Sequence, residues 1–543
     1  MGSGESDSYD LELVHGFGSS PIQRSPSASG RRTKRWSFHD SSKPNLVDLP
    51  SSSGVNQRRL SDLSGIDGVH KEIDSNHVSP AQLYSTESGR LFHAGKICIS
   101  LAGLPGRGKT HLSVSLTRYL RWLGVKTHSF HLGDYRRASA EDDIDHDLFI
   151  PSSTDPKVHK FRRKIVKNCI NDMLNFFQND KGQVAIYDAV NALPEYRVDL
   201  YKKFKELNIQ TIFIESLVTD NSIVLKNMKE AAKSSPDYNN WNYEEAYRDY
   251  SERIRILTPF YQEMGLTEEE KEISYVKFTN FGERIELHNS NYGYLINKVV
   301  FFLMNSRIKV GSVYFARCYN NSVEYADDPP LDEAGKKYAE NLSRTIMDYI
   351  REQGKTHFDE NEEASENVTQ MKESSSSSLE RVPAAGADGV DENSFVIWTS
   401  VKRRTIETTK HFARKGIKIR HRIQLSQKNP GKVGNMTQEE IAKNFPGEYE
   451  QLLGDPYHHR FSRGESYHDL AIKLEPLILE MERMSGDILI IADDTVLKVL
   501  YGYLMACSCY DIPSLHFPMN EIIEIKFNAY SNSSKTIPIK NYV

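Results

Sequence analysis

Residues 103–110 read Gly-Leu-Pro-Gly-Arg-Gly-Lys-Thr, a complete phosphate-binding loop. The glycines of such a loop let successive backbone N–H groups turn toward phosphate, the lysine supplies a positive charge, and the threonine hydroxyl can bind Mg²⁺. A chance glycine-rich turn is the alternative interpretation. The stretch predicts a nucleoside triphosphate site made of Gly103, Leu104, Pro105, Gly106, Arg107, Gly108, Lys109 and Thr110.

The residues around this loop favour the nucleotide site. The apolar run 97–101 predicts a buried parallel strand, and the apolar positions between Leu112 and Leu123 keep helical spacing. Strand-like runs and helical stretches then alternate through residues 90–311. This alternation predicts an α/β domain with a parallel sheet.

A second buried run carries a candidate metal ligand. Residues 184–187 are apolar and lead directly into Asp188, where a carboxylate can hold Mg²⁺ through water. A turn or helix cap is the alternative role for this aspartate. Residues 211–215 predict another buried strand, and we expect acceptor chemistry in the loop that follows it.

Several arginines lie close to these predicted elements. Guanidinium groups bind phosphate esters through paired hydrogen bonds, so the arginines predict a phosphorylated acceptor, although each one alone is typical of a solvated surface. They are Arg136 and Arg137 after the run 131–135, Arg162 and Arg163 at the start of a predicted helix, and Arg253 and Arg255 on another helix.

Composition narrows the class of protein. The 543 residues are 38% hydrophobic, enough for two or three domains with ordinary cores. The net charge of -5 gives no general affinity for nucleic acid or anionic membranes. The five cysteines have neither disulfide nor metal-site spacing, and no apolar run is long enough for a membrane span, so we expect a cytoplasmic protein.

Two segments have the composition of disordered chain. Residues 1–89 are rich in serine and charge and predict a regulatory tail, and the serine-rich stretch at about 354–393 predicts a flexible insertion. Protein kinases are expected partners of the tail, with a purely solvated tail as the alternative. The residues Met1, Gly2 and Ser6 also match the sparse myristoylation pattern. The serines in kinase-like contexts are Ser25, Ser37, Ser61 and Ser79.

The first domain resembles the kinase half of the 6-phosphofructo-2-kinase/fructose-2,6-bisphosphatase family. The resemblance implies a kinase with a parallel sheet that uses ATP and Mg²⁺ to phosphorylate fructose 6-phosphate, and it suggests a homodimer. It implies that Lys109, Thr110 and Asp188 serve ATP and Mg²⁺, and that the sugar phosphate is bound by Arg136, Arg137, Arg162 and Arg253. The matching motifs are the loop at 103–110, Leu-Thr-Arg-Tyr-Leu from Leu116, Leu-Gly-Asp-Tyr-Arg-Arg from Leu132, Tyr-Asp-Ala-Val-Asn from Tyr187, Phe-Ile-Glu-Ser from Phe213 and Ser-Pro-Asp-Tyr from Ser235.

This sequence departs from the family where the sugar is handled. Val190 and Pro194 stand in place of a threonine and an arginine, Ala232 replaces a basic residue beside Lys233, and Leu257 replaces a tyrosine. Each lost polar contact to a buried ligand costs about 1–3 kcal/mol. The nucleotide half of the site is therefore the better preserved half.

Residues 312–543 resemble the histidine-phosphatase half of the same family, an α/β fold related to the phosphoglycerate mutases. That chemistry needs a histidine nucleophile, a carboxylic acid and a second histidine. The sequence has Cys318, Gln427 and Asp493 at those positions, while Arg317 and Arg404 persist. The anchoring motifs are Val-Tyr-Phe-Ala-Arg from Val313, Leu-Asp-Glu-Ala-Gly-Lys from Leu331, Trp-Thr-Ser from Trp398, Arg-Thr-Ile-Glu-Thr from Arg404, Arg-Gly-Glu-Ser-Tyr from Arg463 and Leu-Glu-Pro-Leu-Ile from Leu474.

The replacements predict a phosphatase fold without phosphatase activity. Cys318 is an alternative nucleophile, but Glu324 stands where a cysteine phosphatase needs its arginine, so we expect a small buried residue instead. Three functions stay open: a 6-phosphofructo-2-kinase, a nucleotide-binding pseudoenzyme that acts as a regulator or scaffold, and a kinase with a changed acceptor.

Overall fold

The computed structural model describes residues 58–59, 66–71, 79–82, 95–139, 146–150, 153, 155–290, 293–307, 311–320, 328–354 and 395–540. These residues form two six-stranded sheets and one short strand pair, β1 (Arg58–Arg59) with β12 (Leu515–His516). The two predicted α/β domains are confirmed. Within this described part of the chain, no helix is long and apolar enough to cross a membrane.

The first sheet has the strand order β3-β4-β2-β5-β6-β7. Its pairs are parallel except the last, in which β7 runs antiparallel to β6. All six residues of the central strand β2 are buried, which explains its continuous apolar sequence. The strands are β2 (Ile97–Ala102), β3 (Thr127–His131), β4 (Val184–Asp188), β5 (Gln210–Leu217), β6 (Ser274–Thr279) and β7 (Arg284–His288).

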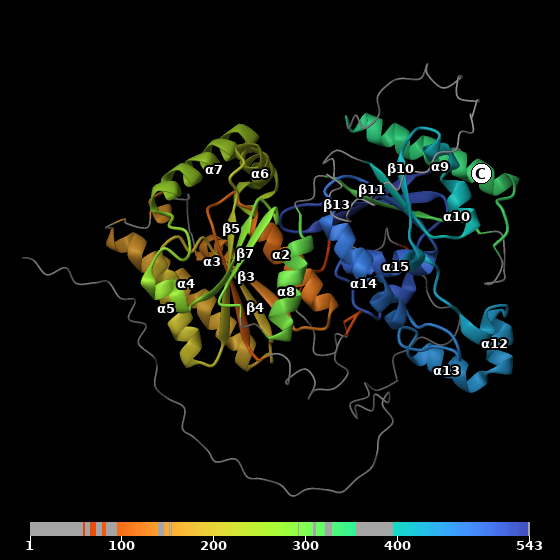
Figure 1. Cartoon of the computed structure of the whole chain (residues 1–543), viewed down its shortest axis with the longest axis horizontal. Coiled ribbons are helices and arrows are strands. Elements are labelled where there is room, and N and C mark those ends of the chain that lie inside the picture. The colour runs from red at the N-terminus through yellow and green to blue at the C-terminus, as the bar shows by residue number, and fades with distance from the viewer. Residues whose placement is uncertain are drawn as a thin grey trace, which may run out of the picture. The chain divides into compact units, whose positions relative to one another are not determined.

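Helices cover both faces of this sheet, with α2 and α8 on one face and α4 and α5 on the other (Figure 1). The helices are α2 (Lys109–Trp122), α3 (Leu132–Ser139), α4 (Pro156–Gln178), α5 (Pro194–Glu206), α6 (Asn221–Ser234), α7 (Tyr243–Leu257) and α8 (Tyr294–Asn305). Short 3₁₀ helices are η2 (His146–Phe149), η3 (Pro236–Tyr238), η4 (Thr258–Phe260) and η5 (Glu268–Glu272).

The predicted elements agree with the structure in type and differ at their ends. The strands expected at 97–101 and 211–215 are each longer, and Asp188 is the last residue of β4. Arg162 does not open a helix as expected. It lies two turns inside α4, which begins at Pro156 with the side chain of Asp155 as its cap.

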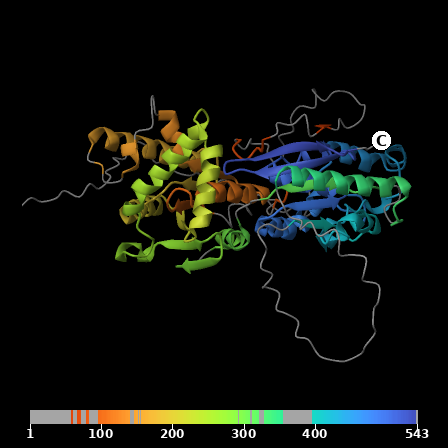
Figure 2. The ribbon, with the colours of Figure 1, turned by 90° about the horizontal axis from the view of Figure 1, so that it is seen from above.

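The second sheet has the order β10-β9-β11-β8-β13-β14, with parallel pairs through β8 and antiparallel pairs beyond it. Helix α9 lies along one face of this sheet (Figure 2), and α14 and α15 pack on the other. The strands are β8 (Val313–Arg317), β9 (Val396–Thr399), β10 (Lys418–His421), β11 (Ile488–Ala492), β13 (Glu521–Phe527) and β14 (Asn532–Pro538). The helices are α9 (Glu333–Glu352), α10 (Arg403–Thr408), α11 (Lys410–Ala413), α12 (Gln438–Asn444), α13 (Pro446–Gly454), α14 (Tyr467–Arg483) and α15 (Asp494–Leu504), with η6 (Ile423–Leu425), η7 (Gly431–Val433) and η8 (Ile512–Ser514).

The two α/β domains share one continuous hydrophobic core, to which both α2 and α14 contribute. Polar contacts add to it: Glu475 of α14 accepts a hydrogen bond from the Tyr119 hydroxyl at 3.1 Å and pairs with Lys298 of α8 at 3.1 Å. The second domain is therefore packed directly against the helix that follows the phosphate-binding loop.

Part of the predicted disordered tail is ordered and buried. Asp67 is 6% exposed and pairs with Arg118 of α2 at 2.8 Å, and Ser79, one of the predicted phosphorylation sites, is 9% exposed. The prediction for residues 1–89 is therefore wrong at 58–59, 66–71 and 79–82, since specific hydrogen bonds offset the ordering entropy of a polar sequence there. Ser25, Ser37, Ser61 and the insertion at 355–393 lie outside the described residues.

Candidate functional site

The phosphate-binding loop lies between β2 and α2, as its sequence predicts. Gly103 and Gly108 have φ angles of 137° and 74°, a region that favours glycine. A Cβ on Gly103 would lie 2.5 Å from the Ser216 backbone oxygen, and one on Gly108 would lie 2.3 Å from the Phe281 ring. Both positions therefore require glycine, which lets the chain make the turn that leads from β2 into α2.

Lys109 is buried at the first position of α2. Its Nζ donates a hydrogen bond to the Leu104 carbonyl at 2.8 Å. Burial lowers the pKa of this ammonium to about 8, although nearby Asp188 opposes the shift. The backbone N–H of Gly106 donates to the Tyr250 hydroxyl at 2.8 Å. Both donors lie where the loop motif presents donors to phosphate.

Thr110 and Asp188 form the candidate Mg²⁺ site. The Thr110 hydroxyl donates to Asp188 Oδ2 at 2.7 Å, and His131 Nδ1 lies 2.8 Å from the same carboxylate oxygen. Burial raises the pKa of Asp188, but hydrogen bonds from His131 and Thr110 and the charge of Lys109 outweigh it and hold the pKa below its usual value. A hydroxyl and an ionised carboxylate are oxygen ligands that suit Mg²⁺.

His131 is a site residue to which the sequence reasoning assigned no role. It ends β3, and its register partner in the parallel sheet is Asp188 at the end of β4. The carboxyl ends of neighbouring parallel strands meet at one edge of a sheet, so adjacency of β3 and β4 is the signal that would have found it. Its other ring nitrogen lies 3.1 Å from the Ser129 hydroxyl, so the ring is held on both sides.

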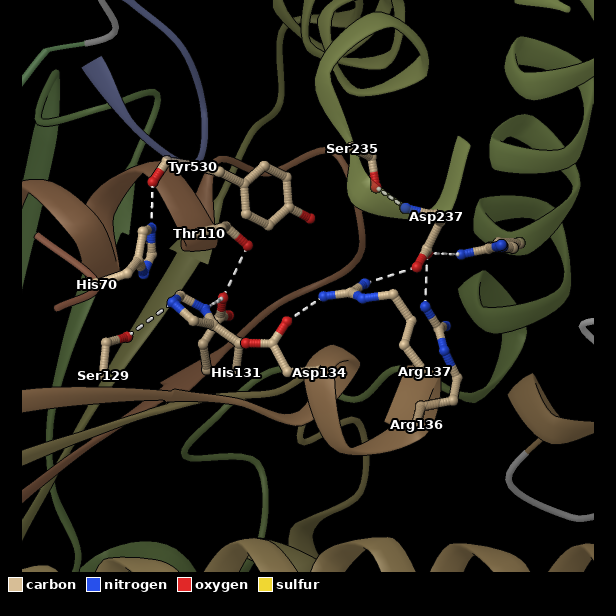
Figure 3. A network of polar contacts seen from close by, with 12 residues as sticks. His70, Thr110, Ser129, His131, Asp134, Arg136, Arg137, Ser235, Asp237 and Tyr530 are labelled. Atoms are coloured by element: carbon tan, nitrogen blue, oxygen red, sulfur yellow. Dashed lines mark hydrogen bonds and ion pairs between the residues drawn. The ribbon is translucent and has the colours of Figure 1, made fainter. Parts of the chain in front are cut away.

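Three of the predicted arginines converge on one buried carboxylate (Figure 3). Asp237 of η3 pairs with Arg136 at 2.5 Å, with Arg137 at 2.6 Å and with Arg253 at 2.6 Å. Burial raises the pKa of Asp237, but the guanidinium groups outweigh it and hold the pKa far below its usual value. The motif containing Asp237 was recognised in the sequence, but its role was missed, because its partners come from two other helices.

The arginine cluster keeps donors for an anionic ligand. Arg253 is 4% exposed, and its Nη2 has no hydrogen-bond partner within the described residues. The Phe149 ring lies 5.2 Å from the Arg136 guanidinium and 4.7 Å from that of Arg253. Arg162 lies apart from Asp237 and donates to the Leu148 and Ile150 carbonyls on either side of Phe149. It therefore fixes the ring on which the other two arginines stack.

The positions that depart from the family are apolar and mostly buried. Pro194 is the buried first residue of α5, and Ala232 and Leu257 are each 5% exposed. Lys233, the candidate substitute for the basic residue at 232, has its ammonium 5.9 Å from the centre of the Tyr243 ring.

The five phosphatase positions meet at the carboxyl edge of the second sheet. Cys318 follows β8 and is 2% exposed, and burial and the charge of Asp493 raise the pKa of its thiol to about 12. Arg404 is 2% exposed and donates to the side chain of Gln427. Asp493 caps α15 by accepting the Thr495 N–H at 3.0 Å, and Arg317 donates to the Phe517 carbonyl at 3.2 Å. Glu324 lies outside the described residues.

Tyr530 is a further residue of the first site that the sequence reasoning missed. It lies in the loop between β13 and β14 of the second domain, yet its side chain points toward Ser235 and Asp237 of the first (Figure 3). Nothing in the local sequence around residue 530 predicts this placement.

Comparisons with known proteins find a matching family model for each half of the chain. A family model described as 6-phosphofructo-2-kinase matches residues 84–310, and one described as histidine phosphatase superfamily (branch 1) matches residues 375–539. A Saccharomyces cerevisiae protein provisionally named 6-phosphofructo-2-kinase/fructose-2,6-bisphosphatase is 39% identical over 98% of this chain and 98% of its own length.

Two further relatives are more distant. A Saccharomyces cerevisiae protein named fructose-2,6-bisphosphatase is 31% identical over 80% of this chain and 87% of its own length. The Rattus norvegicus 6-phosphofructo-2-kinase/fructose-2,6-bisphosphatase 3 is 29% identical over 80% of this chain and 70% of its own length.

Proposed function

Because the chain belongs to the 6-phosphofructo-2-kinase/fructose-2,6-bisphosphatase family, we propose that it is an ATP-dependent 6-phosphofructo-2-kinase without bisphosphatase activity. The proposal assigns the kinase to residues 90–311 and a catalytically degenerate phosphatase fold to residues 312–543. The observation that carries it is the nucleotide site, in which Thr110 contacts Asp188 at 2.7 Å beside the buried Lys109.

In this proposal the residues around the nucleotide neutralise the negative charge of its phosphates. Lys109 lies where it would face the outer phosphates, while Thr110 and Asp188 would hold Mg²⁺, which when bound would supply further positive charge to the phosphate oxygens. His131 orients the Asp188 carboxylate from the opposite side at 2.8 Å. These groups are fixed before the nucleotide binds, so little reorganisation is needed during transfer.

The acceptor side binds and orients fructose 6-phosphate. Arg136, Arg137 and Arg253 face its phosphate and so position its 2-hydroxyl toward the nucleotide. A bond forms between this hydroxyl oxygen and the γ-phosphorus, the bond from that phosphorus to the bridging oxygen breaks, ADP leaves, and the hydroxyl proton is released. The products are fructose 2,6-bisphosphate and ADP.

Loss of the phosphatase reaction follows from the groups at its site. A thiol whose pKa is raised to about 12 is almost entirely protonated at neutral pH, so Cys318 does not replace a histidine nucleophile. Gln427 cannot donate a proton to a leaving oxygen as a carboxylic acid does. Asp493 adds negative charge where the substrate brings phosphate.

The test is formation of fructose 2,6-bisphosphate from ATP, Mg²⁺ and fructose 6-phosphate by the purified full chain. We expect product with the unmodified protein and with Lys229→Ala, which changes an exposed lysine on α6, and none with Lys109→Ala. Absence of product from the unmodified protein, or equal product from Lys109→Ala, would refute the proposal.

A second candidate function is a nucleotide-binding pseudoenzyme or a kinase for another sugar phosphate. The apolar residues Pro194, Ala232 and Leu257 favour it, since each replaces a polar contact to the sugar. Nucleotide binding that depends on Lys109, with no transfer to fructose 6-phosphate, is the result that would select it. Transfer to other phosphorylated sugars would then separate its two forms.

A further inference from the structure

The loop between β13 and β14 carries a tyrosine of the second domain into the kinase site. Residues 528–531 connect the two strands, and the Asn528 N–H donates to the Ser531 carbonyl at 3.2 Å. The Tyr530 ring lies 6.5 Å from the His131 ring, and its hydroxyl points toward Ser235 and Asp237 (Figure 3).

The Tyr530 hydroxyl faces groups from both halves of the kinase site. It interacts with the Ser235 hydroxyl, and the charges of Asp237, Arg137 and Asp188 also act on it. Burial raises the pKa of this phenol, so it stays protonated and uncharged. The ring thus lies between the carboxylate assigned to Mg²⁺ and the arginines assigned to the acceptor phosphate.

A short N-terminal segment, residues 66–71, holds the loop in this position. His70 Nε2 contacts the Tyr530 carbonyl oxygen, and the His70 ring lies 5.7 Å from that of His131. Asp67 accepts a hydrogen bond from the Asn532 N–H at 2.7 Å and donates its own N–H to the Asn532 carbonyl at 3.0 Å.

The same segment is anchored to the helix of the phosphate-binding loop. Arg118 of α2 pairs with the buried Asp67 at 2.8 Å, and Arg121 donates to the carbonyls of Val69 at 2.6 Å and Lys71 at 3.0 Å. The loop carrying Tyr530 is therefore connected through residues 66–71 to the first domain at several points, and its position over the site is specified by the fold.

We propose that Tyr530 is an intramolecular occupant of the acceptor site, which the second domain supplies and which must withdraw before a phosphorylated sugar binds. The inference rests on the proposed function for the identity of the acceptor and adds regulation of the same site. It gives the degenerate domain a role, since that domain positions the loop. An acceptor binds only the fraction of molecules in which the loop is withdrawn, so its apparent affinity is reduced by that fraction.

The test is binding of fructose 6-phosphate to the full chain, measured by calorimetry with a non-hydrolysable ATP analogue present. Tyr530→Phe removes the hydroxyl and should tighten binding roughly fivefold, the net contribution of about one hydrogen bond. Tyr530→Ala also removes the ring and should tighten it by about tenfold or more. His70→Ala, which loosens the loop from the other side, should shift affinity in the same direction. Tyr510→Ala, at a 53% exposed position of the same domain, is the matched control and should change nothing.

The outcomes separate this inference from the proposed function. Tighter binding in the Tyr530 variants supports the inference even if no variant transfers phosphate, in which case only the proposed function fails. Unchanged or weaker binding in Tyr530→Ala overturns the inference, even if the unmodified protein makes fructose 2,6-bisphosphate. A shift equally large in Tyr510→Ala also overturns it.

Discussion

Asp237→Asn removes the one negative charge shared by three arginines while keeping the size of the side chain. The carboxylate is 6% exposed, and its three ion pairs measure 2.5, 2.6 and 2.6 Å. Breaking a buried ion pair from one side costs about 3–5 kcal/mol, because the remaining charges stay desolvated. Arg137 is 23% exposed and is partly solvated, so we take this range for the whole cluster and do not multiply it by three.

The assay is thermal unfolding, with urea unfolding as a second measure. A loss of about 3–5 kcal/mol corresponds to a fall in Tm of roughly 6–20 °C for a domain of this size. The control is Asp134→Asn, because Asp134 is 60% exposed and pairs only with Arg137 among the three. An exposed pair contributes less than about 1 kcal/mol. Equal losses in the two variants would show that the buried carboxylate of Asp237 contributes no more stability than the exposed one of Asp134.

The Asp237 variant also has a ligand-dependent signature and a pH-dependent one. Without Asp237 the arginines keep Asp249, which pairs with Arg253, and Asp134, which pairs with Arg137. The loss of the shared charge should still make them bind inorganic phosphate more tightly, so phosphate should raise the Tm of Asp237→Asn more than that of the unmodified protein. A depressed carboxylate pKa stabilises the fold above the unfolded value of about 3.9, and this stability is lost as the pH falls below it toward the folded pKa. The variant should therefore lose less stability on acidification below pH 4.

Three further predictions concern the nucleotide and phosphatase sites. Because the pKa of Lys109 is about 8, ATP should bind more weakly as the pH rises above 8, by about tenfold per pH unit. Lys109→Arg should remove this pH dependence. An unchanged pH dependence in that variant would contradict the assignment of Lys109 to the phosphates. Asp188→Asn should weaken Mg²⁺ binding in the nucleotide complex about 10- to 100-fold in a Mg²⁺ titration, with unaltered affinity as the opposing result. With a pKa of about 12, roughly one Cys318 thiol in ten thousand is ionised at pH 8. Mass spectrometry should therefore find Cys318 alkylated by iodoacetamide only after the protein is unfolded. Rapid labelling of Cys318 in the native chain would show that this thiol can act as a nucleophile.

The parts of the site that the sequence predicts are those determined by local sequence. The loop at 103–110 and the strand ending in Asp188 are contiguous motifs whose chemistry follows from neighbouring residues. The roles of Arg136 and Arg253 were expected from residue type, and the structure brings both to one carboxylate. The sequence could not give their shared partner, because contacts between three separate helical elements depend on tertiary packing.

The second domain's contribution to the candidate site of the first domain lies beyond local sequence reasoning. Tyr530 is 460 residues from His70 in the chain, and only the packed fold brings the two together. The segment 66–71 is polar enough to suggest disorder, and it is ordered by the buried pair of Asp67 and Arg118 and by backbone hydrogen bonds. Composition indicates how much apolar surface a segment can bury, but it does not indicate such specific polar contacts.

A kinase without phosphatase activity is tested most directly by following one preparation of the full chain through synthesis and storage of its product. The protein is incubated with ATP, Mg²⁺ and fructose 6-phosphate, the ATP is then removed enzymatically, and fructose 2,6-bisphosphate is measured over time. We expect product to form only with Lys109 intact and its level then to stay constant. No formation would contradict the kinase, and loss of product with release of phosphate above the Lys109→Ala background would contradict the degenerate phosphatase.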